Sequence, residues 1–232
     1  NVQLGLNGNP EIAEHIAVAR DLELAHYTGA RVHFSKITTA RSLELIENAK
    51  KQGLAVSCDV TAHHLVFNEE DLLNYNTQLK FTPPLRTPED QAALIAGVKS
   101  GTIDTVVSDH TPILAEDKKC EFPLAETGAI GLQTFFPLLA KAFEETVFYQ
   151  KVIPAITKNP RHLLGVPQVS IEPGQKADFT LFNFNKSWQF DKSTNASRST
   201  NSPVFGETLT GQVIATAANN QVTIHPNSSQ IK

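Results

Sequence analysis

Three short apolar runs, separated by segments with helical periodicity, constrain the fold of this chain most. The runs cover residues 31–35, 54–60 and 103–107. The spacing of apolar residues before, between and after the runs predicts helices over 10–28, 39–52, 68–73, 88–100, 131–145, 148–157 and 159–164. Strands that alternate with helices in this way form parallel sheets with crossover helices, so an α/β fold is favoured.

Polar side chains follow each apolar run directly. Lys36 follows the first run, His63 and His64 follow the second, and Asp109 and His110 follow the third. In a TIM barrel the active site lies at the carboxyl ends of the strands, so we expect these side chains to share one mouth. An aspartate there can bind a metal ion and move a proton.

The pattern of the sequence changes near residue 165, from helical periodicity to short strand patterns with turn residues. Residues 1–165 read as a barrel-type α/β domain, and residues 166–232 read as a small β-rich domain. Short antiparallel strands are predicted within 169–184 and 211–224, with a loop rich in Ser, Thr, Asn and Lys over 185–201.

Composition excludes several classes of function. The 232 residues include 20 basic and 24 acidic side chains, a balance that does not favour nucleic acid as a partner. No run of about 18 apolar residues predicts a membrane span. Two cysteines are too few for a disulfide framework, so we expect a reduced, cytoplasmic protein with Cys58 buried in a strand.

Several motifs, in this order and spacing, resemble the C-terminal part of the dihydroorotase family, within the amidohydrolase superfamily. The motifs are Glu23-Leu-Ala-His-Tyr-Thr-Gly-Ala-Arg31, Val60-Thr-Ala-His-His-Leu65, Thr82-Pro-Pro-Leu-Arg-Thr87, Ser108-Asp-His-Thr-Pro112, Gly128-Ala-Ile-Gly-Leu132 and Ile171-Glu-Pro-Gly-Gln-Lys-Ala-Asp178. The resemblance covers nearly the whole chain. It implies strands five to eight of a TIM barrel, followed by a small β-sandwich-like appendage.

The resemblance also implies a reaction and a metal. Family members interconvert carbamoyl-aspartate and dihydroorotate in pyrimidine synthesis, with zinc as the cofactor. Asp109 matches the last family aspartate, which binds zinc and acts as general base. His64 matches a family histidine ligand, and Lys36 stands at another ligand position. An ammonium cannot ligate zinc, so the zinc site is expected to be degenerate.

The implied substrate positions are also altered. Thr82 stands where the family has an asparagine, and Ile113 stands where it has a histidine that binds the substrate carboxylate. Arg86 could contact an anion or form a surface salt bridge of little energetic worth. Asp109 could instead cap a helix or form an ion pair, with Lys36 as the partner. For His64 we favour a hydrogen-bonded histidine without a metal.

Two functions remain open at this point. The departures resemble inactive dihydroorotase-like subunits that assemble with the catalytic chain of aspartate transcarbamoylase, so a non-catalytic, homo-oligomeric partner is the first hypothesis. An active zinc dihydroorotase, or another cyclic-amide hydrolase, is the second. Because this chain builds only about half a barrel, we also expect that residues 1–232 do not fold as an isolated monomer and belong to a longer polypeptide.

Overall fold

The computed structural model describes residues 5, 6 and 8–225, and it contains two sheets with helices between and beside them. The first is a parallel sheet of β1 (Val32–Phe34), β2 (Val56–Thr61) and β3 (Thr105–Val107), in the order β1-β2-β3. Within the described residues this gives three barrel strands, where the resemblance implied four.

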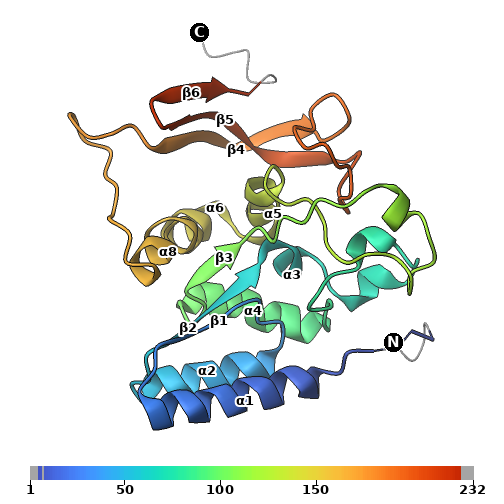
Figure 1. Ribbon diagram of the computed structural model, residues 1–232. Coiled ribbons are helices and arrows are strands. Elements are labelled where there is room, and N and C mark those ends of the chain that lie inside the picture. The colour runs from blue at the N-terminus through green and yellow to red at the C-terminus, as the bar shows by residue number, and fades with distance from the viewer. Residues whose placement is uncertain (1–4, 7, 226–232) are drawn as a thin grey trace.

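Long helices connect the parallel strands, as the periodicity predicts. They are α1 (Glu11–Thr28), α2 (Ala40–Lys51) and α4 (Pro88–Ser100). The sequence sets their ends: the Thr39 and Thr87 side chains accept hydrogen bonds from first-turn N–H groups, and Gly29 and Gly101 end α1 and α4 in left-handed conformations. α1 and α2 lie side by side along one side of the sheet (Figure 1).

Shorter elements fill the connections. They are α3 (Ala62–Val66), the 3-10 turns η1 (Glu69–Leu72), η2 (Thr77–Leu79) and η3 (Glu116–Lys118), α5 (Phe135–Ala142), α6 (Glu145–Val147), the π-helical turn η4 (Phe148–Val152), α7 (Ile153–Ile156) and α8 (Lys158–Leu163). The helix predicted for 131–145 begins only at Phe135. Residues 129–131 instead run beside the residues that follow β3, where Ala129 pairs with His110 and its carbonyl oxygen accepts the Thr111 N–H.

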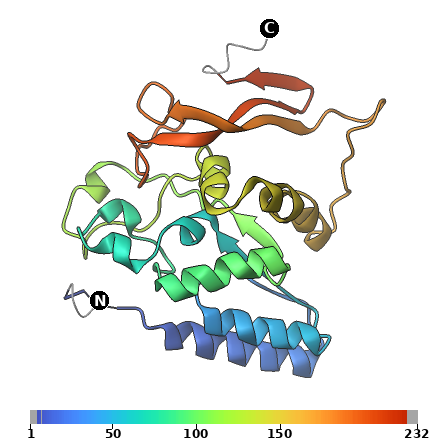
Figure 2. The same cartoon turned by 180° about the vertical axis from the view of Figure 1, so that it is seen from behind.

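The second sheet is antiparallel and contains β4 (Phe179–Gln189), β5 (Thr208–Ala218) and β6 (Gln221–Ile224). Two expectations were wrong in detail. No strand forms over 169–178, and β4 continues to Gln189 inside the predicted loop, where Trp188 pairs with Leu209. Seen from behind, this sheet lies at the opposite side of the molecule from α1 and α2 (Figure 2).

One hydrophobic core joins the two sheets. Phe182 and Phe184 of β4 contact the ring of Phe148, whose side chain is fully buried. Phe136 of α5 lies 4.5 Å from Phe182, measured between ring centroids. The sheet type changes between β3 and β4, while the apolar core is continuous across both sheets. The division into two domains near residue 165 stays a prediction.

β1 and β3 are the outer strands of the parallel sheet in the described part of the chain. β2 is buried at every position, while β1 is only partly buried and carries the half-exposed His33. The predicted failure of residues 1–232 to fold alone stays a prediction. Within the described residues, no helix is long and apolar enough to cross a membrane.

Candidate functional site

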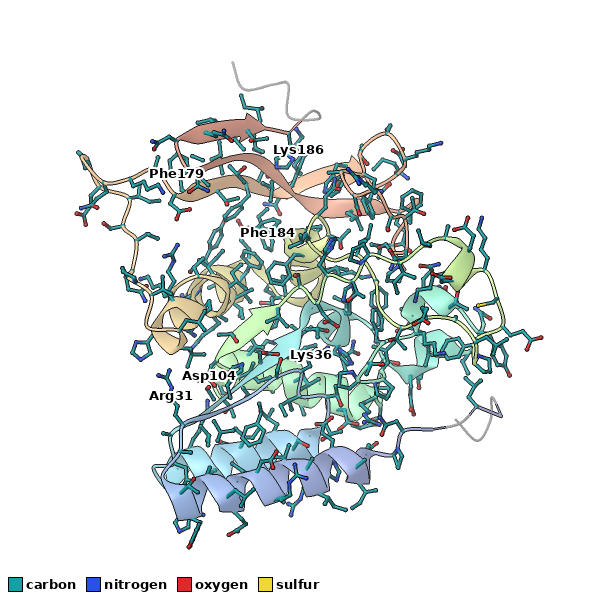
Figure 3. All side chains as sticks on the ribbon, viewed as in Figure 1. Arg31, Lys36, Asp104, Phe179, Phe184 and Lys186 are labelled. Atoms are coloured by element: carbon teal, nitrogen blue, oxygen red, sulfur yellow. The ribbon has the colours of Figure 1, made fainter. Side chains whose placement is uncertain are left out.

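The predicted mouth forms at the carboxyl end of the parallel sheet. Lys36 follows β1 and Asp109 follows β3, and the Lys36 Nζ atom lies 3.2 Å from an Asp109 carboxylate oxygen. The same ammonium donates to the carbonyl oxygen of Thr82 at 3.1 Å. Figure 3 shows Lys36 at the end of the sheet opposite Arg31 and Asp104, which precede their strands.

Asp59, a residue that the sequence did not single out, fixes the backbone of Lys36. Its buried carboxylate accepts the Lys36 N–H at 2.7 Å through one oxygen. The other oxygen accepts from Ser35 Oγ and lies 3.0 Å from His33 Nε2. Alternation along β1 and β2 could have found this layer, because His33, Ser57 and Asp59 share one face of paired strands.

His64 lies in α3 rather than at the strand end, because Thr61 ends β2 and caps the helix. Its Nδ1 atom lies 2.7 Å from Thr61 Oγ1, and its Nε2 atom lies 3.1 Å from the Pro83 carbonyl oxygen. Burial, the largest cause, lowers the pKa of His64 to about 4. The ring is therefore neutral, and both of its nitrogens have partners.

His63 is buried more completely and has no polar partner. Neither ring nitrogen has a hydrogen-bond partner, and the ring stacks on Phe81 with 4.7 Å between centroids. Burial, with a smaller contribution from His64, lowers the pKa of His63 to about 3. His110, in contrast, accepts hydrogen bonds at Nδ1 from the backbone N–H groups of Gly131 and Leu132.

Two of the predicted substrate positions, Arg86 and Ile113, make contacts within the chain. Arg86 is buried, and its guanidinium donates to Thr38 Oγ1 at 3.1 Å and to the Asn9 carbonyl oxygen at 2.6 Å. Arg86 is therefore a buried, hydrogen-bonded residue and not a partner in the surface salt bridge that was one of its two expected roles. Ile113 donates its backbone N–H to Asn201 Oδ1 at 3.2 Å, and its side chain offers no polar group.

Hollows open near both ends of the parallel sheet in the described part of the chain. One, of about 330 Å³, lies beside the mouth between α1 and the end of β1 and is lined in part by Lys36, Glu14 and Arg86. The other, of about 540 Å³, lies at the opposite end of β3 beside Asp104 and His162. The larger hollow contains none of the predicted site residues, and the smaller one contains Lys36 and Arg86 but not Asp109 or His64.

The donor set at this mouth does not suit a zinc ion. The Lys36 ammonium has no lone pair with which to bind a metal ion. A neutral imidazole binds a metal ion through a free ring nitrogen, and both ring nitrogens of His64 already have hydrogen-bond partners. No group of three or more His, Cys, Asp or Glu side chains arranged to hold a metal ion occurs in the described part of the chain.

The sequence profile of the amidohydrolase family matches residues 7–222. The chain belongs to the amidohydrolase family. Curated relatives include the dihydroorotase of Syntrophus aciditrophicus, 36% identical over 223 residues that cover 96% of this chain and 52% of the relative. The Bacillus subtilis dihydroorotase is 39% identical over 216 residues, covering 92% of this chain and 50% of the relative. This amidohydrolase chain thus spans about half the length of these relatives.

Solved structures agree with the fold. The L-hydantoinase of Arthrobacter aurescens aligns with a TM-score of 0.83 and 26% identity, over 94% of this amidohydrolase chain and 50% of the other. An inactive dihydroorotase-like domain of a Chaetomium thermophilum CAD-like multifunctional protein aligns with a TM-score of 0.65 and 23% identity, over 90% of this chain and 57% of the other. The three parallel strands are therefore part of a TIM barrel, as the sequence predicts.

Proposed function

We propose that this amidohydrolase is a dihydroorotase-like protein of pyrimidine biosynthesis that acts in the cytoplasm without catalysing the family reaction. Its similarity to proteins named dihydroorotase, at 36% to 40% identity, supports the pathway. The proposed non-catalytic role rests on the mouth itself, and its proposed partner is the catalytic chain of aspartate transcarbamoylase.

The observation that carries the proposal is the ion pair between Lys36 and Asp109. A general base must accept a proton from the reacting group at hydrogen-bond distance. The Asp109 carboxylate instead lies 3.2 Å from an ammonium that also binds the Thr82 carbonyl oxygen. Because the ammonium already contacts this carboxylate at hydrogen-bond distance, Asp109 must leave Lys36 before it can accept a proton from a reacting group or bind a metal ion.

The altered substrate positions support the same proposal. The Ile113 side chain cannot donate a hydrogen bond to a substrate carboxylate, and Arg86 is committed to Thr38 and Asn9. A charged substrate group that loses its partner on binding costs about 1.5–3 kcal/mol for each missing charged hydrogen bond. Affinity for a dicarboxylate such as carbamoyl-aspartate would fall accordingly.

Metal analysis of the full-length protein, purified without chelator, tests the proposal. We expect less than one zinc per chain by elemental analysis and no conversion of dihydroorotate in a coupled assay at pH 6–9. Two zinc ions per chain together with turnover would overturn the proposal. One zinc per chain without turnover would overturn the metal part of it and leave the catalytic part standing.

The alternative is an active zinc dihydroorotase or another cyclic-amide hydrolase. The retained Asp109, which lies at the mouth and is partly exposed, favours it. Under this alternative Lys36 would have to move away from Asp109 when metal and substrate bind. The same assay, run with dihydroorotate and with hydantoin as substrates and with added zinc, separates the two functions.

A further inference from the structure

We propose that the Lys36 ammonium is a built-in structural cation, which holds the ends of β1 and β3 and the loop after Phe81 together, as a bound metal ion would hold its ligands. This inference deepens the proposed function and rests on it in one respect: no metal ion competes with Lys36 for the Asp109 carboxylate. It assigns Lys36, Asp59 and Asp109 to one positioning unit.

Three segments meet at this ammonium. Lys36 itself extends β1, Asp109 extends β3, and the Thr82 carbonyl oxygen comes from the loop between η2 and α4. Thr82 and Asp109 are 46 and 73 positions away from Lys36 along the chain, so the two contacts close long loops. β1 and β3 each pair with β2 and not with each other, so a single positive charge directly joins the ends of these two strands and the loop.

The backbone conformations indicate that the ion pair is built in. Lys36 and Asp109 both lie in the left-handed region, with φ of 60° and 46°. Such conformations cost non-glycine residues free energy and persist only where the surroundings fix them. Asp59 fixes the first by accepting the Lys36 N–H at 2.7 Å. Both residues of the ion pair thus lie in backbone conformations that are uncommon for non-glycine residues, and Asp59 holds that of Lys36.

Neutral His64 fixes the third segment. Its Nε2 atom lies 3.1 Å and 3.3 Å from the Pro83 and Pro84 carbonyl oxygens, next to the Thr82 carbonyl that Lys36 contacts. Its Nδ1 atom lies against Thr61 Oγ1 at the end of β2. The loop is therefore connected to β2 through the neutral ring of His64 and to β1 through the charged ammonium of Lys36.

A double-mutant cycle in the full-length protein tests the inference. The variants are Lys36→Met, Asp109→Asn and the double variant, and the readout is the midpoint of thermal unfolding with and without EDTA. Each single variant should lower the midpoint by about 2–4 °C. The double variant should fall no further than the worse single variant, because removing one partner already removes the shared interaction. EDTA should leave the wild-type midpoint unchanged.

The control is Lys51→Met, which removes an exposed i,i+4 pair with Glu47 and should shift the midpoint by less than about 1 °C. Additive shifts in the cycle, or no shift from Lys36→Met, would overturn the inference. If Lys36→Met does not fold, the double variant should recover folded protein, and failure to recover it also overturns the inference. Zinc and turnover in the wild type would instead refute the proposed function, while the cycle would still decide the role of Lys36.

Discussion

At the scale of single residues, His63 and His64 make the molecule sensitive to acid. Burial lowers their folded-state pKa values to about 3 and about 4 from an ordinary value near 6.5. At pH values between the folded and the ordinary pKa, the unfolded chain binds more protons than the folded chain. The contribution of these histidines to the free energy of unfolding is therefore highest above pH 6.5 and decreases as the pH drops toward the folded pKa values. The loss approaches about 1.4 kcal/mol per pH unit for each histidine.

His63→Phe is expected to reduce this sensitivity. Phenylalanine can keep the stacking on Phe81 and removes two buried ring nitrogens that lack partners. Urea unfolding of both proteins from pH 7.5 to pH 4.5 measures the effect. The variant should be at least as stable near pH 7.5, and its advantage should grow as the pH falls. Parallel stability curves for the two proteins would contradict the assignment.

Lys36→His is not expected to restore dihydroorotase activity by itself. The substitution supplies an imidazole, yet the Ile113 side chain still offers no donor to the substrate carboxylate. The missing charged hydrogen bond should keep turnover at least tenfold below that of the double variant Lys36→His with Ile113→His. A steady-state assay in excess zinc compares the two, and robust turnover by the single variant would be inconsistent with this role for position 113.

At the scale of elements, the approach of residues 129–131 to the end of β3 requires glycine at position 131. A Cβ atom there would lie 2.2 Å from the Ser108 carbonyl oxygen and 3.2 Å from His63 Cε1. The close approach also places the Gly131 N–H 3.0 Å from His110 Nδ1. The segment that begins α5 is therefore fixed against the mouth by backbone contact, which explains why helix 131–145 is shortened.

Gly131→Ala should destabilise the protein by about 1–3 kcal/mol, because the backbone must shift to relieve the overlap with Ser108. Chemical unfolding gives the difference directly. The matched control is Leu132→Ala at the next position, where the side chain is 66% exposed and the expected change is within about 0.5 kcal/mol. Equal effects of the two substitutions would show that the close approach is not energetically important.

At the scale of the whole molecule, the proposed role is to assemble with aspartate transcarbamoylase. We expect the full-length protein to co-elute with the transcarbamoylase catalytic chain in size-exclusion chromatography at micromolar concentration. The complex should persist in EDTA, since the proposed assembly does not depend on metal. Independent migration of the two proteins at that concentration would remove the main support for the partnership.

The assembly can be separated from the chemistry of the mouth. Asp109→Asn removes a negative charge inside the mouth. If the interface with the transcarbamoylase catalytic chain lies elsewhere, this substitution should not affect it. The variant should co-elute with the catalytic chain as the wild type does, provided that circular dichroism shows it to be folded at the temperature of the experiment. Loss of co-elution by a folded Asp109→Asn protein would place the mouth itself at the interface.

The amino-acid sequence by itself determined the parallel strands, their connecting helices and the general place of the site. Buried parallel strands need nearly continuous apolar runs, and helix ends need capping residues, so both leave local patterns such as Thr39, Thr87 and Gly101. The position of Lys36 and Asp109 after two such strands was enough to predict one shared mouth.

Only the tertiary structure decided what the residues at the mouth do. Asp59 holds Lys36, Arg86 is buried against Thr38, and His64 binds loop carbonyls, through contacts between residues 19 to 48 positions apart. Alternation can place Asp59 on a face of the sheet, but local patterns do not name the partners in these contacts, because the partners depend on how strands and loops meet after folding. The extension of β4 to Gln189 has the same cause: a polar segment becomes a strand there because Trp188 and Leu209 pair across the sheet.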